Sequence, residues 1–320
     1  MGYEVVRDRQ RPAGRPVGGM AVCEGVMMRG DATWAVAVRA PEGNVVVLVD
    51  DLPRWAERFE RAPVLRGVAA LAESMVMGVK AMMWSVAQTV EGRRRQAPMS
   101  VGRTVLLAVA LVAGIFFVLP ATIAKVLTAG EHALWFNAVE SSVRLALFFA
   151  YLSAIGRIPE VRRLFEYHGA EHMAVSTHEA GAELTIAAAT GRSTRHARCG
   201  TTFMLVVMVV ALLSHVAFGA PAWPQLLASR LLVVPLVAGV SYEVLRFAGG
   251  HLRWRSMRWV LAPGMALQAL TTRRPSDDQL EVALVALRAV LPAPAPEPLE
   301  AAGTVAQTRL RGLVAPLPSP

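Results

Sequence analysis

The stretch TVLLAVALVAGIFFVLPATIA, residues 104–124, decides the fold class because it contains no charged residue. A helix that crosses the hydrocarbon core of a bilayer needs roughly 20 consecutive apolar residues. Three further segments have a similar character: residues 138–156, residues 200–229, which also carry no charge, and residues 230–249. We therefore predict a mainly α-helical, polytopic membrane protein with about four transmembrane helices.

The overall composition supports this prediction. Hydrophobic residues make up 54% of the chain, and the formal net charge is +9. Such a charge is typical of nucleic-acid binding, of contact with an acidic membrane surface, or of arginine-rich cytoplasmic loops. The polar N-terminus lacks an apolar core, so we expect no cleavable signal peptide. With only two cysteines, a disulfide framework is not expected, and a reduced, cytosol-facing location is the default.

The distribution of arginine predicts the orientation in the membrane. Four crossings place the N-terminal region, the central loop and the C-terminal region on one side, and these segments hold the arginines near the spans. By the positive-inside rule this side is cytoplasmic, so both termini are expected in the cytoplasm and the chain in the inner (plasma) membrane. No motif points to nucleic acid, so the expected partner is the lipid bilayer.

The expected organisation follows from these spans. An N-terminal cytoplasmic region, 1–100, holds a β-hairpin at 33–50 and a long amphipathic, mostly apolar helix at 64–90. The remaining parts are transmembrane helices at 101–156, a cytoplasmic loop at 157–201, transmembrane helices at 202–250, a cytoplasmic C-terminal region at 251–291, and a disordered tail at 292–320. The helix at 64–90 fits two roles, packing against other helices or lying along the membrane.

The C-terminal region contains a second amphipathic pattern. The sequence SDDQLEVALVALRAV, residues 276–290, predicts a helix with Leu280, Leu284 and Leu287 on one face. Asp277 or Asp278 is the expected N-terminal cap.

A histidine pair in the central loop is the main chemical signal. Residues 159–180 predict a helix, and on a helix His168 and His172 lie one turn apart on one face, where both imidazoles could hold one metal ion. The order H-x-x-E-H makes Glu171 the expected general base. Gly169 weakens the helix prediction. The alternative is that both imidazoles simply bond backbone carbonyls or Glu166.

A second pair strengthens the metal hypothesis. His196 and Cys199 precede the third predicted span, in an H-x-x-C spacing that suits zinc. Because the loop begins and ends at the same membrane face, both pairs are confined near it. Three protein ligands with water would make a catalytic site, and four a structural one. Cys199 could instead be a small apolar residue at a helix entry. Glu179 and Glu166 are candidates for the groups that orient the ligands.

The N-terminal stretch VGGMAVCEGVMMRG, residues 17–30, places two charged residues among apolar ones. It matches no nucleotide-binding motif. We expect Glu24 and Arg29 to pair with each other, because an unpaired buried charge is costly. The alternative is that Glu24 adds a carboxylate to the metal cluster.

Several of these motifs, in the same order, resemble a known family of bacterial membrane proteins, domain of unknown function 1385. The resemblance covers roughly residues 17–290 and rests on GGMAVCEGVMMRG, EYHGAEH, RCGTTF, RLLVVPLVAGVSYEVLRFAG and TTRRPSDDQLEVALVAL. The family is often labelled as predicted metal-dependent enzymes. The positions that the resemblance implies are Glu24, Arg29, His168, Glu171, His172, His196, Cys199 and Glu243.

This chain departs from the family pattern at three positions. Met20 stands where a glutamine is expected, Cys23 where an aliphatic residue is expected, and Met173 where a lysine is expected. Cys23 is therefore not expected to be a required ligand, and the change at Met173 leaves the histidine pair intact.

Two functions remain open at this point. The first is a zinc-dependent enzyme, most simply a hydrolase, at the cytoplasmic membrane surface. The second is a membrane scaffold, assembly factor or transporter with a structural metal; the charge pairs Glu140/Arg144 and Glu243/Arg246 within predicted spans favour it mildly. The sequence names neither a substrate nor an oligomeric state, and a homo-oligomer stays open.

Overall fold

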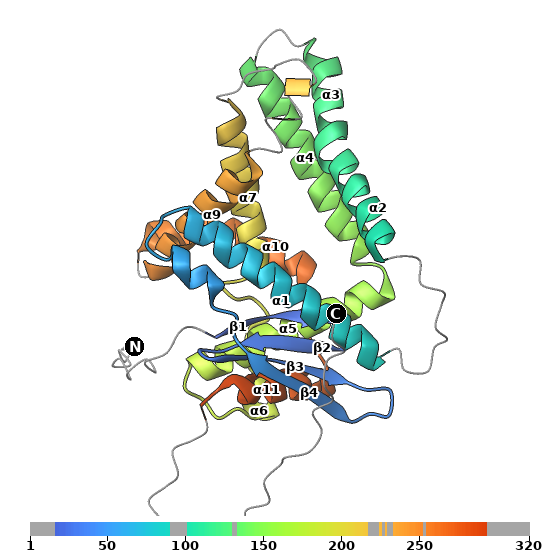
Figure 1. The fold of residues 1–320 in the computed structure, drawn as a ribbon, viewed down its shortest axis with the longest axis vertical. Helices are drawn as coiled ribbons and strands as arrows, with labels where there is room; N and C mark the ends of the chain where they lie inside the picture. Colours follow the sequence, from blue (N-terminus) through green and yellow to red (C-terminus); the bar gives the residue numbers. More distant parts are fainter. Residues whose placement is uncertain are drawn as a thin grey trace, which may run out of the picture.

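A computed structural model describes residues 17–89, 101–129, 133–216, 224–225, 228, 233–251 and 254–292. Most of this chain is helical, and a small antiparallel sheet of four strands lies at its N-terminal end (Figure 1). The predicted tail at 292–320 lies almost entirely outside the described residues.

The sheet is a simple meander of β1 (Gly18–Val22), β2 (Gly25–Arg29), β3 (Thr33–Arg39) and β4 (Val45–Asp51). The predicted hairpin at 33–50 is confirmed as β3 and β4, which pair from Thr33 opposite Asp51 to Arg39 opposite Val45. The sequence prediction missed β1 and β2. Because β2 is covered on both faces, its sequence GVMMR lacks the apolar–polar alternation of a half-exposed strand.

Helices cover both faces of this sheet. On one face, Val26, Met28, Ala35 and Ala37 pack against α5 (Pro159–Glu179), α6 (Ile186–Thr190) and α11 (Asp277–Val290). The alternate residues Met27, Trp34, Val36 and Val38 point the other way and pack against Met77 and Ala81 of α1 (Leu65–Thr89). This two-residue period is that of a strand with two buried faces.

The helix α1 confirms the prediction at 64–90 and lies between the sheet and the helices above it (Figure 1). The short helix η1 (Trp55–Phe59) precedes it. One side of α1 packs on the sheet, and its beginning contacts α9, where Gly67 lies against Tyr242. Its opposite side exposes Met75, Val79 and Met83.

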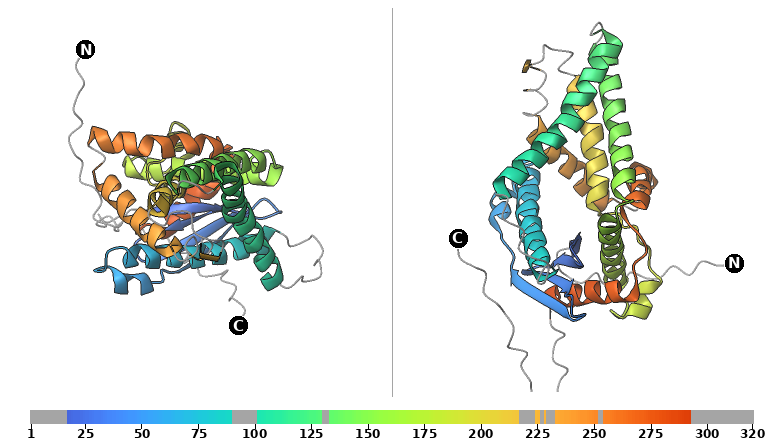
Figure 2. Two further views of the ribbon diagram at one scale, coloured as in Figure 1. Left: turned by 90° about the horizontal axis from the view of Figure 1, so that it is seen from above. Right: turned by 90° about the vertical axis from the view of Figure 1, so that its right-hand side faces the viewer.

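The remaining helices lie above α1 in the view of Figure 1, and those drawn in green and yellow project farthest from the sheet (Figure 2). They are α2 (Val101–Ala113), the π-helical turn η2 (Gly114–Val118), α3 (Leu119–Thr128), α4 (Ala133–Ile155), α7 (Gly200–Val216), α9 (Val234–Gly250) and α10 (Arg255–Thr271). Large apolar side chains on α2, α3 and α4 are exposed, Leu127 by 67% and Leu134 by 68%.

Two segments of the described chain are long and apolar enough to cross a membrane, Val109–Thr128 and Ala133–Ile155. The four predicted crossings are therefore not confirmed, and two apolar helices only weakly indicate membrane association. The third prediction corresponds to the shorter apolar stretch Gly200–Ser214, and much of 217–232 lies outside the described residues. The second span begins earlier than predicted, at Ala133 instead of residue 138.

Two local predictions in the C-terminal region need correction, and one is confirmed. The cap of α11 is Ser276, not an aspartate: its hydroxyl accepts from the backbone of Gln279, whose side chain bonds back to Ser276 in a capping box. The helix α10 was missed, because Pro263 within it suggests a break. The predicted helix faces of α11 are confirmed, since Leu280, Leu284 and Leu287 are buried.

The charged pairs are partly as predicted. Glu140 and Arg144 do pair on α4, and the Arg144 Nε also donates to the carbonyl of Phe116 (2.8 Å) in the π-helical turn. Glu243 instead binds Arg66, whose Nε lies 2.7 Å from Oε1. This second pair fastens the beginning of α1 to α9, so it holds two elements together that are far apart in sequence.

Candidate metal centre

The helix α5 carries both histidines of the predicted pair, and Pro159 starts it as expected. Gly169 lies within the helix because the chain after α10 passes very close: a Cβ there would lie 2.0 Å from the carbonyl oxygen of Arg273. The close approach is continued by a hydrogen bond from the Arg273 amide to the Phe165 carbonyl (2.9 Å). Gly169 thus allows this segment to reach the histidines.

Backbone carbonyls fix the orientation of both imidazoles. The Nδ1 of His168 lies 2.8 Å from the carbonyl oxygen of Thr271, and the Nδ1 of His172 lies 2.6 Å from that of Thr194. A carbonyl oxygen only accepts, so each Nδ1 carries the proton and donates it. Each Nε2 of the neutral ring then presents a lone pair, which is the arrangement found in metal-binding histidines.

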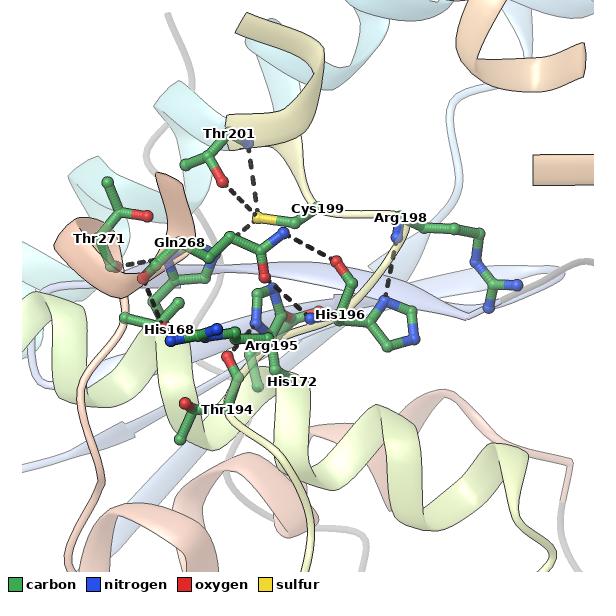
Figure 3. Close-up of polar contacts among 12 residues, drawn as sticks. His168, His172, Thr194, Arg195, His196, Arg198, Cys199, Thr201, Gln268 and Thr271 are labelled. Atoms are coloured by element: carbon green, nitrogen blue, oxygen red, sulfur yellow. Dashed lines mark hydrogen bonds and ion pairs between the residues drawn. The ribbon is translucent and has the colours of Figure 1, made fainter. Parts of the chain in front are cut away.

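Cys199 joins the two imidazoles from the start of α7. Its Sγ lies 3.3 Å from the Nε2 of His168, and it accepts from the amide of Thr201 (3.4 Å) (Figure 3). One ligand atom from each of His168, His172 and Cys199 lies within 4.8 Å of the other two. The structure therefore brings together three of the four residues predicted as ligands.

This donor set fits zinc. Two imidazole nitrogens and one sulfur are ligands that zinc favours, with bonds of about 2.0–2.1 Å to nitrogen and about 2.3 Å to sulfur. In a tetrahedron of that size, neighbouring nitrogen and sulfur ligands lie roughly 3.5 Å apart. The separation of Cys199 Sγ and His168 Nε2, 3.3 Å, is close to this value.

Glu171 lies beside the cluster and is almost completely buried. Its Oε2 is 3.5 Å from the Nε2 of His172. Burial raises the pKa of the Glu171 carboxyl, while the nearby His168 and His196 and a hydrogen bond from the Gly19 backbone act to lower this pKa. A carboxyl whose pKa is raised in this way is better able to take up a proton than an exposed one.

His196 lies next to the cluster, but its ring nitrogens contact other partners. Its Nε2 lies 3.2 Å from Oε2 of Glu179, and its Nδ1 accepts from the backbone amide of Arg198 (3.4 Å). The centroid of its ring is 5.8 Å from that of His172. Burial lowers the pKa of His196, and the charge of Glu171 opposes this effect. His196 and Glu179 therefore stand at the edge of the site.

The other two predicted carboxylates lie away from the cluster. Glu24 binds the Nε of Arg163 with both oxygens (2.5 and 2.7 Å) and accepts from Tyr167 (3.4 Å). Burial raises the pKa of the Tyr167 hydroxyl. Glu166 accepts from the side chain of Gln279 at the start of α11 (3.1 Å).

The predicted pair of Glu24 and Arg29 is therefore wrong. Arg29 binds Glu73 of α1 instead, at 2.8 Å. Glu24 directly precedes β2 and Arg29 ends it, so the strand keeps the two side chains apart, and each has a partner on a different helix.

Sequence reasoning missed Gln268 of α10, which holds the loop between the two ligand segments. Its Oε1 accepts from the amide of His196 (2.8 Å) and its Nε2 donates to the carbonyl of the same residue (2.9 Å) (Figure 3). The signal was a lone amide side chain in the apolar run VLAPGMALQAL. Such a buried amide needs partners, and here it finds them in the backbone.

A small cavity of about 50 Å³ lies over the cluster. His168, Glu171, His172 and Cys199 line it together with Arg198, and Val17–Gly19 of the N-terminal segment close another side. This volume is sufficient for water molecules or for a small chemical group.

Comparison with known proteins gives the family but no activity. The family model described as "Protein of unknown function (DUF1385)" matches residues 62–293. The uncharacterised protein YqhQ of Bacillus subtilis (strain 168) is 29% identical over 297 residues, which is 86% of this chain and 92% of the relative. No solved structure shows significant similarity to the chain. Because the family match covers well over half of its residues, the chain belongs to the DUF1385 family of proteins of unknown function.

Proposed function

We propose that this protein is a membrane-bound, zinc-dependent hydrolase whose metal is held by His168, His172 and Cys199. The observation that carries the proposal is the convergence of one ligand atom from each residue within 4.8 Å. The two carbonyl contacts that leave each Nε2 available support it further. Zinc bound there would supply Lewis acidity toward a water molecule or a substrate oxygen.

Glu171 is the proposed general base. Its carboxylate is within 3.5 Å of one ligand atom, yet the group of mutually close ligand atoms found among the described residues does not include it. A carboxylate at this position can take a proton from a water molecule bound between it and the ligands. Glu179 contacts the ring of His196 and none of the three proposed ligands. In this proposal both residues therefore border the site without binding the metal.

The competing proposal is a structural zinc site in a scaffold, assembly factor or transporter. It requires a fourth protein ligand, for which Glu171 and His196 are the nearest candidates. The observation that favours it is the ion pair of Glu140 and Arg144, buried among helices that resemble membrane spans. Three ligands with an adjacent buried carboxylate favour the catalytic alternative.

The proposed location is the cytoplasmic surface of the inner membrane, with four crossings formed by α2–α3, α4, α7 and α9. The exposed apolar side chains of these helices support it, because a soluble protein rarely exposes so much apolar surface. Cys199 directly precedes α7, so the metal centre would lie where that helix leaves the membrane. Both termini would then be cytoplasmic.

Zinc content tests the site. The full-length protein, purified in detergent, is expected to hold about one zinc ion per chain, and Cys199→Ser to lose it. Cys23→Ser is the matched control, because Cys23 contacts Thr89 and not the cluster, and it should keep the ion. Equal zinc in wild type, Cys199→Ser and Cys23→Ser would exclude the site.

The role of Glu171 separates the two functions. Glu171→Gln is expected to keep its zinc and to unfold at nearly the wild-type temperature, since the amide has the same shape. A loss of zinc as complete as that of Cys199→Ser would make Glu171 a ligand and favour the structural role.

A further inference from the structure

Arg198 lines the same cavity as the proposed zinc ligands, and it is the basic side chain nearest to them in sequence. Its guanidinium forms an ion pair with Glu179, whose carboxylate also contacts the Nε2 of His196. The side chains of Arg198 and Glu179 are 42% and 37% exposed. An ion pair this exposed is screened by water, so a competing anion can replace Glu179 at low cost.

The segment that leads to Cys199 is basic. The stretch GRSTRHARC, residues 191–199, carries Arg192, Arg195 and Arg198 and no acidic residue, and Arg198 is the one of these three arginines that lines the cavity. A positive charge at a small cavity raises the local concentration of anions. A guanidinium also matches the geometry of phosphate oxygens with two parallel hydrogen bonds.

Two glycines that line the cavity have open space beside them. A Cβ added at Gly18 or at Gly200 would meet no heavy atom of the described residues within 4 Å. Both glycines line the cavity, and Gly200 is the first residue of α7. The cavity therefore has open space beside the helix that is proposed to enter the membrane.

We propose that this cavity binds the phosphate group of a phosphate ester, with Arg198 binding its anionic oxygens after leaving Glu179. This inference rests on the zinc hydrolase proposed above and gives its substrate class. In the reaction, a water oxygen bonds to phosphorus while the ester P–O bond breaks. Glu171 takes a proton from the water and passes that proton to the oxygen of the leaving alcohol.

Phosphate binding is the test, measured by calorimetry on the full-length, zinc-loaded protein with inorganic phosphate as the probe. Arg198→Gln is expected to weaken binding by about tenfold or more, the effect of losing one charged hydrogen-bonding partner. Arg198→Lys should weaken it less. Glu179→Gln should strengthen phosphate binding, because this change removes the competing carboxylate. The amide oxygen of the new side chain can still accept a hydrogen bond from His196.

Arg195→Gln is the matched control. It removes the same charge from the same loop, but Arg195 is exposed and is not among the residues that line the cavity. It should change phosphate affinity by less than about twofold. Equal weakening in Arg195→Gln and Arg198→Gln would overturn the role of Arg198. Binding of acetate as tight as that of phosphate would overturn the substrate class.

Two competitors distinguish the sources of the phosphate group. Displacement by a soluble monoester such as glycerol phosphate would indicate a free metabolite, and displacement by a short-chain phosphatidylglycerol would indicate a lipid headgroup. Failure of both to compete would overturn the inference. Zinc is measured on the same samples. Absence of zinc from the cluster of the wild-type protein would overturn the proposed function. If Arg198→Gln holds its full zinc and binds phosphate as tightly as the wild type, this inference alone is overturned.

Discussion

The sheet with its covering helices and the projecting helices α2, α3 and α4 use similar apolar residues in opposite ways. In the sheet region, Val26, Val36 and Leu287 are completely buried. In the projecting region, Leu119 and Leu127 are exposed, while Glu140 is buried. Apolar side chains outside and an ion pair inside are the expected arrangement for helices surrounded by lipid. The comparison therefore supports the proposal that lipid surrounds the projecting helices and water surrounds the sheet region.

The largest expected effect comes from breaking the ion pair of the projecting region. Glu140→Ala would leave the Arg144 charge buried without its carboxylate, which costs about 3–5 kcal/mol of stability. The matched pair in the sheet region is Arg39 with Glu281, whose side chain is 49% exposed. Glu281→Ala should cost only about 0–1 kcal/mol. Chemical unfolding in detergent measures both.

Similar losses in these two variants would contradict the difference in surroundings. The contrast holds only if the carboxylate of Glu140 is shielded from water in the folded protein.

A charge placed on the exposed face of the projecting helices should have a somewhat smaller effect, and this effect tests whether that face contacts lipid. Leu119 is exposed near the middle of Val109–Thr128, and Leu119→Arg is expected to cost about 2.5–3.5 kcal/mol of membrane insertion. Val49 is similarly exposed on β4, and Val49→Arg should cost almost nothing, because water surrounds it. The measurement is the fraction of each variant recovered in the membrane. Normal insertion of Leu119→Arg would mean that α3 does not face lipid.

The smallest expected effect lies in the sheet region. Ser276→Ala removes the hydroxyl that caps α11 and should lower stability by about 1 kcal/mol. Asp277→Ala is the control, because Asp277 follows the cap and no cap bond involves it. The two midpoints of thermal unfolding are compared. An equal decrease for both variants would mean that the cap hydroxyl contributes no more than its neighbour Asp277, and would contradict the capping prediction.

The sequence predicted those parts of the molecule that depend on local pattern. The spacing of His168 and His172 is a property of one helix, and the two β-branched runs around the turn residues 40–44 are a property of one hairpin. The helices α1 and α11 could also be predicted from the sequence, because their apolar residues repeat with the helical period.

The rest depends on contacts between distant segments, which leave little trace in one sequence. The partners of the two histidines are backbone carbonyls of Thr271 and Thr194, and any residue type supplies a carbonyl. Glu24 and Arg29 looked like a pair because they are near in sequence, but a strand separates them. Gly169 weakened the helix prediction, and the structure explains why a glycine is needed there: the backbone of Arg273 passes too close for any side chain.

The contact of Gln268 with the loop has a consequence for how this protein can change. The side-chain amide of Gln268 binds the backbone N–H and C=O of residue 196, and any amino acid other than proline at this position would supply these two groups. Gln268 therefore holds the backbone of residue 196 whichever of these side chains is carried there. The contact between the His196 ring and the Arg198 amide is a second hold on the chain toward Cys199, so a substitution at this position removes one hold and keeps the other.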